Sequence, residues 1–114
     1  MLQMREKLNH QTTVISFTGR LDRQSTIGIG DLILRTKDMR CPHIMLDFTG
    51  ITGLDSVGLG LLFLWYHQLQ PHQIGLSIVG PSPGVQATLE SWHLPDFVPV
   101  FASEHEAVRQ EAYC

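Results

Sequence analysis

A strand-like apolar run and a longer helix-like apolar run lie on either side of one short polar junction in this chain. The first run covers residues 43–48, the junction ends with residues 55–60, and the second run spans residues 61–69. A buried strand that leads into a helix places the helix N-terminus at the carboxyl end of that strand. Such an N-terminus presents free backbone N–H groups and a partial positive charge. Ser56 lies at the predicted helix start, so it either caps the helix or holds out a hydroxyl for chemistry.

The order of the predicted elements favours an α/β fold. Residues 13–18 are rich in β-branched and aromatic side chains and, with residues 5–9, predict an opening β-hairpin. Strand-like and helical segments then alternate, which predicts one domain, residues 1–114, with a mixed, mostly parallel sheet of about five strands under about four helices. The later predicted segments are a helix over 25–37, a strand over 43–48, a turn over 50–53, a helix from 56 to 70, a strand over 76–79, a helix opening at Ser82-Pro83, a strand over 97–101 and a helix opening at Ser103.

Several polar side chains fall where predicted strands end and predicted helices begin. In sheets with parallel crossovers, functional groups gather at this edge. Two glycines just inside the junction helix leave room there for the backbone of a partner. The polar residues are Asp22, Asp47, Asp55 and Ser56, and the glycines are Gly58 and Gly60.

Composition and charge exclude several classes of function. A chain of 114 residues with 43% hydrophobic residues fits one folded domain. No lysine follows Lys37, and only Arg109 offsets the acidic residues after residue 41, so no dense basic surface for nucleic acid is expected. The apolar runs are too short to insert in a membrane. Two isolated cysteines, Cys41 and Cys114, fit a reducing compartment, so we expect a cytoplasmic protein.

The common catalytic patterns are missing from the sequence. The junction lacks the first glycine of a Gly-x-Ser-x-Gly nucleophile elbow, and a P-loop is absent. A receiver-type phosphoacceptor aspartate at Asp47 would need an acidic pair after the first strand and a late lysine, and both are missing. The six histidines show no metal-ligand spacing. We therefore expect a non-enzyme with no cofactor and no metal.

Four segments together resemble a STAS domain, and more specifically a bacterial anti-sigma-factor antagonist. The most specific of them is the Asp-Ser-x-Gly-Leu-Gly element, and the order of all four follows the family over nearly the whole chain. Two features depart from the family pattern: Val57 stands where a second small hydroxyl residue is common, and the first helix contains Gly28 and Gly30. The matching segments are residues 17–22, 44–48, 54–60 and 78–81.

The resemblance implies a phosphorylation switch at Ser56. In the family, a partner anti-sigma kinase phosphorylates the serine at this position, and a PP2C-type phosphatase restores it. The unphosphorylated form binds the anti-sigma factor and frees the sigma factor. The resemblance also places Asp22 beside the phosphorylation site. The expected surroundings and partner-binding residues are Asp22, Asp55, Val57, Gly58, Leu59, Gly60 and Phe63.

Simple electrostatics agrees with a switch, although alternatives remain. A phosphate adds about −1.5 to −2 charges to an acidic site, which a helix N-terminus tolerates but a docked partner does not. Leu59, Phe63 and Tyr66 form a second apolar stripe on the junction helix, which is either a partner patch or part of the core. Ser56 and Asp55 are alternatively plain helix caps. The alternative function is a STAS interaction subunit, never phosphorylated, in a lipid-transport or transporter complex.

Overall fold

The computed structural model describes residues 3–9, 12–22 and 42–111. The helix predicted over residues 25–37, with its two glycines, lies outside the described residues. Across the described part of the chain, the predicted α/β class and the mixed sheet are confirmed. Three α-helices and two short 3-10 helices accompany the sheet in these ranges.

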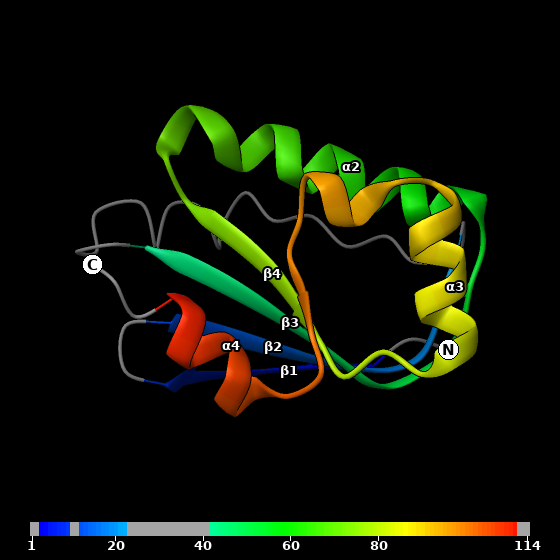
Figure 1. Cartoon of the computed structure of the whole chain (residues 1–114), viewed down its shortest axis with the longest axis horizontal. Coiled ribbons are helices and arrows are strands. Elements are labelled where there is room, and N and C mark those ends of the chain that lie inside the picture. The colour runs from blue at the N-terminus through cyan, green and yellow to red at the C-terminus, as the bar shows by residue number, and fades with distance from the viewer. Residues whose placement is uncertain (1–2, 10–11, 23–41, 112–114) are drawn as a thin grey trace.

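Five described strands form one sheet, in the spatial order β1-β2-β3-β4-β5 (Figure 1). The first two strands pair antiparallel, so the predicted opening hairpin is confirmed, and the remaining neighbours pair parallel. Parallel neighbours require crossover connections, which carry the chain from the carboxyl end of one strand back to the amino end of the next. The strands are β1 Gln3–Asn9, β2 Thr12–Leu21, β3 His43–Leu54, β4 Gly75–Val79 and β5 Val100–Phe101.

The described helices cover both faces of this sheet. Helices α2 (Ser56–Leu69) and α3 (Pro83–Ser91) lie on one side, and α4 (Glu104–Glu111) lies on the other (Figure 1). The 3-10 helices η1 (Gln70–His72) and η2 (Leu94–Asp96) follow α2 and α3. Within the described residues, no helix combines the length and the apolar character needed to cross a membrane.

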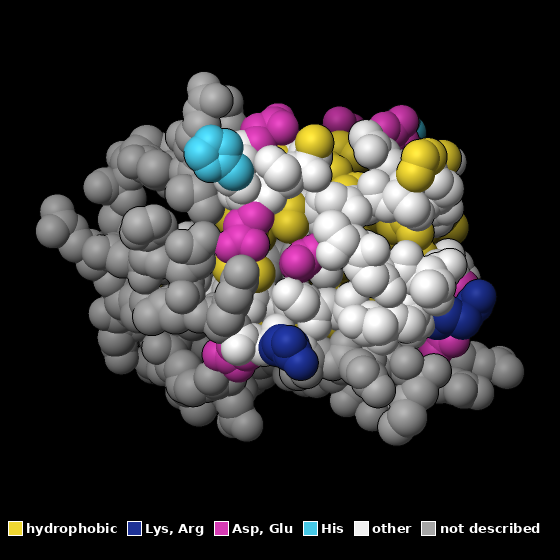
Figure 2. Space-filling model, turned by 90° about the horizontal axis from the view of Figure 1, so that it is seen from below, with side chains coloured by type: hydrophobic (Ala, Val, Ile, Leu, Met, Phe, Trp, Pro, Cys, Tyr) yellow, Lys and Arg dark blue, Asp and Glu magenta, His cyan; other side chains and the backbone are white. Residues whose placement is uncertain are grey.

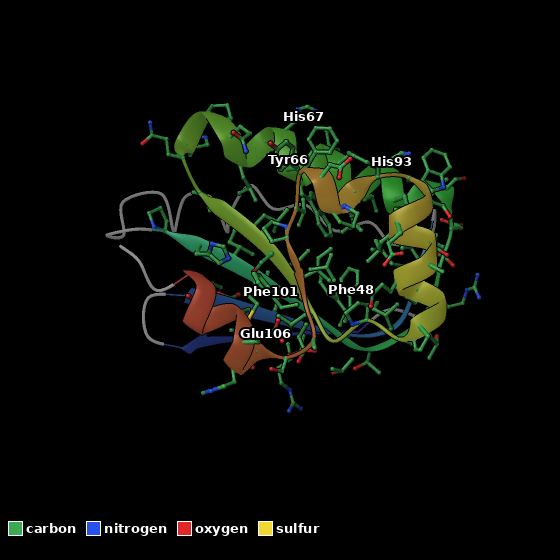
Figure 3. The ribbon with its side chains drawn as sticks, viewed as in Figure 1. Phe48, Tyr66, His67, His93, Phe101 and Glu106 are labelled. Atoms are coloured by element: carbon green, nitrogen blue, oxygen red, sulfur yellow. The ribbon has the colours of Figure 1, made fainter. Side chains whose placement is uncertain are left out.

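Alternating side chains of the central strands build two separate cores. The larger core lies under α2, where Phe17 stacks on Trp65 with ring centroids 6.1 Å apart and meets Phe48 edge-on at 5.8 Å. The smaller core, on the α4 side, contains Val14, Met45, Val79 and Ala107, with Phe101 packed against it. Figure 3 shows Phe48 in the larger core, and Phe101 and Glu106 on the α4 side.

The predicted turn over residues 50–53 is wrong, because β3 continues to Leu54 beside β2. The two strands stay paired through two irregularities in register, one of them next to Gly19, whose φ is 114°. A Cβ on Gly50 would lie 2.5 Å from the carbonyl oxygen of Phe17. Gly50 therefore allows β2 to approach closely and does not mark a turn.

The strand predicted over residues 97–101 is shorter than expected. Only Val100 and Phe101 pair with β4, opposite Ile78 and Val79. Residues 94–96 form η2. Phe97 caps the C-terminus of η2, and its backbone N–H donates to the carbonyl of Leu94. Pro99 lacks an N–H for pairing, which fits the late start of this edge strand.

Candidate functional site

The ends of β2 and β3 bring the predicted site together. Leu21 and Leu54 are register partners at these ends, and the backbone N–H of Asp55 donates to the carbonyl of Leu21 at 3.4 Å. Asp22 and Asp55 are the next residues after the paired ends, so both lie at one edge of the sheet. This edge is the carboxyl end of two parallel strands, as the sequence predicted.

Asp55, not Ser56, caps α2. Asp55 has an extended backbone, and its Oδ1 accepts a hydrogen bond from the backbone N–H of Gly58 at 2.8 Å. Ser56 is the first residue of the helix and is exposed. No hydrogen bond joins its hydroxyl to any residue that the structure describes. The cap interpretation is therefore right for Asp55 and wrong for Ser56, whose hydroxyl is left facing solvent.

The two glycines of the motif have different roles. Gly58 is buried, and a Cβ there would lie 2.2 Å from the carbonyl oxygen of Leu21, so it lets the first turn of α2 pack on β2. Gly60 is exposed, and a Cβ there would meet nothing within 4 Å. Gly60 alone leaves open space beside Ser56, and Gly58 is needed for packing inside the domain.

A cation lies at the same edge, and sequence reasoning assigned it no role. The Nε of Arg20 is 3.7 Å from Oδ2 of Asp22. Arg20 is also the register partner of Gly53, and a Cβ on Gly53 would lie 2.8 Å from one terminal nitrogen of the guanidinium. The signal in the sequence was the i, i+2 spacing of Arg20 and Asp22, which puts both side chains on one face of a strand end.

Asp47 lies away from this site. It sits within β3, where its Oδ1 accepts from the backbone N–H and the hydroxyl of Thr49 at 3.0 and 2.8 Å. Its Oδ2 accepts from the Ser16 hydroxyl at 3.3 Å. The junction predicted for Asp47 is wrong because β3 runs on to Leu54, and its carboxylate instead holds neighbouring backbone and hydroxyl groups.

The second apolar stripe of α2 is mostly internal. Leu59 is 1% exposed and belongs to the larger core, so for this residue the core alternative is the right one. Phe63 and Tyr66 are partly buried, with ring centroids 6.0 and 5.7 Å from that of Phe97. Figure 3 shows Tyr66 and its neighbour His67 on α2.

The exposed apolar side chains of α2 form a different line. Val57 is 47% exposed and Leu64 is 49% exposed, and they stand seven residues apart. Seven residues are two helical turns, so both side chains share one face with Leu61 and the open Gly60. We call Val57, Gly60, Leu61 and Leu64 the α2 exposed stripe. Sequence reasoning missed Leu64, although its spacing from Val57 was available.

The described residues form no metal site, and the face seen in Figure 2 has no concentrated positive patch among them. The face in Figure 2 carries acidic side chains at several places and no continuous patch of Lys and Arg among its described residues. Within residues 3–9, 12–22 and 42–111, no three His, Cys, Asp or Glu side chains converge as metal ligands do.

Comparisons with known proteins identify the fold family. The family model for the STAS domain matches residues 2–107. No curated protein matches the chain. Among solved structures, an anti-sigma factor antagonist from Mycobacterium paratuberculosis is 19% identical with a TM-score of 0.84, over 98% of this chain and 95% of that one.

Two further structures show how widely this fold is used. The Bacillus cell fate determinant SpoIIAA, in its phosphorylated form, is 22% identical with a TM-score of 0.66, over 95% of this chain and 98% of that one. The murine anion transporter Slc26a9 is 17% identical with a TM-score of 0.74, but the match covers 91% of this chain and only 18% of the transporter. These identities show a shared fold, and the family match shows that this chain belongs to the STAS domain family.

Proposed function

We propose that this protein is an anti-sigma-factor antagonist that switches partners through phosphorylation of Ser56. The whole chain, residues 1–114, acts as one STAS domain in the cytoplasm. Its unphosphorylated form binds an anti-sigma factor that is also a serine kinase, and phosphorylation releases it. A PP2C-type phosphatase returns it to the binding form. In this scheme the protein is the substrate of the kinase and catalyses nothing itself.

The exposed hydroxyl of Ser56 carries this proposal. A kinase must take a serine hydroxyl into its own active site, which a hydroxyl engaged in helix capping resists. Here Asp55 supplies the cap through its hydrogen bond to Gly58, so Ser56 contributes nothing to holding the helix start. The first turn of a helix also favours negative charge, because its N–H groups and dipole point there. A phosphate on Ser56 is therefore compatible with the fold.

The α2 exposed stripe is the proposed docking surface. It begins beside Ser56 and presents two half-exposed aliphatic side chains, Val57 and Leu64, on one helix face. Gly60 between them leaves room for a partner backbone. Phe63 contributes its exposed edge from the neighbouring face, and Leu59 and Gly58 support the surface from beneath.

Charge explains how one phosphate breaks this contact. Asp22 and Asp55 already stand at the edge from which α2 begins, with Arg20 as the nearby cation. A phosphate adds about −1.5 to −2 charges there. A partner surface that matches the unmodified site then meets like charge and a strongly solvated group, and such a mismatch costs several kcal/mol across an interface. That penalty is sufficient to dissociate a complex of ordinary affinity.

The alternative is a STAS interaction subunit of a lipid-transport or transporter complex that is never phosphorylated. The likeness to part of Slc26a9 concerns the fold and does not favour this role. A docking subunit uses the α2 exposed stripe but has no need for an exposed serine at its edge. The position of Ser56 outside the cap therefore favours the switch.

Peptide mapping of the protein from its native cells tests the proposal. We expect a fraction of the Ser56 peptide to carry one phosphate, which disappears on treatment with a PP2C-type phosphatase and in a Ser56→Ala strain. Capture of partners with the Ser56→Ala protein should recover an anti-sigma kinase. Recovery of transporter subunits together with an unmodified Ser56 under all growth conditions would replace the switch with the docking role.

A further inference from the structure

Three aromatic rings meet where α2 passes the end of η2. The ring centroid of Phe97, the residue after η2, lies 6.0 Å from that of Phe63 and 5.7 Å from that of Tyr66, at interplanar angles of 72° and 59°. Such edge-on and tilted contacts are favourable and hold the Phe97 ring in position. Phe97 is nevertheless 52% exposed. We call Phe63, Tyr66 and Phe97 the aromatic cluster.

Two oxygen-bearing groups at this cluster are open to an outside donor. The hydroxyl of Tyr66 makes no hydrogen bond with any described residue. Asp96 directly precedes Phe97, and Oδ2 of its carboxylate lies 3.8 Å from Nδ1 of His93, which is too long for a hydrogen bond. The side chains of His93 and Asp96 are 79% and 72% exposed. Figure 3 shows Tyr66 and His93 on the α2 side of the sheet.

The charge of this part of the chain indicates the kind of partner that fits. Residues 42–108 contain no lysine or arginine. The next cation in the sequence, Arg109, belongs to α4, on the opposite side of the sheet from α2 (Figure 1). Complementary charge favours association, so a positively charged partner surface suits this side of the molecule. The acidic residues of residues 42–108 are Asp47, Asp55, Glu90, Asp96, Glu104 and Glu106.

An arginine side chain matches this combination of an exposed ring and free oxygen acceptors. Its planar guanidinium stacks on an aromatic ring and donates from its edge to carboxylate or hydroxyl oxygens. A lysine ammonium is a compact and strongly hydrated charge, so it gains less from the ring. A ring that is already held in position also loses little conformational entropy when a partner binds.

We propose that the aromatic cluster and Asp96 form a docking site for a basic, arginine-containing segment of a partner protein. The site adjoins the α2 exposed stripe, because Phe63 directly precedes Leu64 on α2. A partner that docks on the stripe can therefore extend onto the cluster. The inference goes beyond the proposed switch, since the arginine site needs no phosphate on Ser56.

An NMR titration of the full chain with a capped pentapeptide that contains two arginines tests this site. The same peptide with two lysines is the comparison, and carbon-13 labelling of phenylalanine follows the ring signals. We expect the Phe97 ring signals to shift, and the arginine peptide to bind about 2–5-fold more tightly than the lysine peptide. Phe97→Leu keeps an apolar side chain but removes the ring, and should weaken binding of the arginine peptide by about 2–5-fold. Asp96→Asn should weaken it by about 2–5-fold.

Matched substitutions control for loss of any exposed ring or carboxylate. Trp92→Leu removes a ring that is 53% exposed, and Glu90→Gln removes an exposed carboxylate of α3; both should change the affinity less than the site variants. Equal affinities for the two peptides, or equal losses with Trp92→Leu and Phe97→Leu, overturn the arginine site. Self-association of the chain that Phe97→Leu abolishes would assign the surface to a second copy instead. Ser56→Ala should bind the arginine peptide as the wild type does, so failure of this site and failure of the switch are separate results.

Discussion

The starts of α2 and α3 contain the same residue type in two different roles. At α3, Ser82 is the cap, its hydroxyl accepting from the backbone N–H of Val85 at 3.4 Å, and Pro83 takes the first helical position. At α2, Asp55 takes the cap at 2.8 Å, and the serine moves one position into the helix. The serine at the start of α3 therefore stabilises its helix as the cap, whereas the serine at the start of α2 has no capping role.

The two starts also differ in how they meet the sheet. The first turn of α2 packs so closely on β2 that Gly58 has no room for a Cβ, whereas Gly84 in the first turn of α3 has nothing within 4 Å. The start of α2 is therefore fixed rigidly against two strand ends while its serine remains accessible. A modification site benefits from this combination, because a rigid support holds the added charge in one position.

The largest expected difference in the free energy of unfolding comes from replacing the glycine in the first turn of each helix with alanine. Gly58→Ala should destabilise the protein by about 2–3 kcal/mol, because the new Cβ meets the rigid carbonyl of Leu21 and not a flexible side chain. Gly84→Ala, the matched change at α3, should be neutral or stabilising by up to about 1 kcal/mol. Urea unfolding of both variants measures the difference. Equal free energies of unfolding for the two would show that α2 does not pack as described.

Removal of the caps should give the next largest effect. Asp55→Ala loses a short hydrogen bond and a carboxylate at a helix N-terminus, and we expect a cost of about 1–2 kcal/mol. Ser82→Ala loses a longer, uncharged hydrogen bond and should cost about 0.5–1 kcal/mol. Thermal and urea unfolding give both values. A Ser82→Ala variant that is the more destabilised of the two would contradict this ranking.

The smallest effect is expected at Ser56 itself. Ser56→Ala should change the free energy of unfolding by less than about 0.5 kcal/mol, since its hydroxyl holds no described group. Ser82→Ala, measured in the same way, is the reference for a serine that does cap. A Ser56→Ala protein as unstable as the Ser82→Ala protein would return Ser56 to a structural role.

The sequence predicted those parts of the fold that local chemistry decides. The hairpin, the capped start of α3 at Ser82 and the start of α4 at Ser103 follow from residue types next to one another, and Ser103 does accept from the backbone N–H of Glu106 at 3.2 Å. The acidic residues at the ends of β2 and β3 also followed from the element order. In each case the determining partners lie within a few residues.

The sequence-based predictions failed where contacts with a distant part of the chain determine the local conformation or the burial of a residue. Gly50 has the appearance of a turn residue, and only the approach of Phe17 from β2 shows that it belongs to a strand. Leu59 and Leu64 are the same residue type on one helix, and the sheet beneath determines that the first is buried and the second exposed. The position of the Arg20 side chain over Gly53 depends on the register between β2 and β3, which no local pattern reveals.

The central claim is that phosphate at Ser56 breaks partner binding and leaves the fold intact. Calorimetric titration of the anti-sigma kinase with unmodified and phosphoserine-56 protein, alongside thermal unfolding of both, tests the two halves together. We predict an affinity lower by about 100-fold or more for the phosphorylated protein, with Tm changed by only a few degrees, and wild-type affinity for Ser56→Ala. Equal affinities for the two forms, or a loss of affinity that accompanies unfolding, would contradict the account.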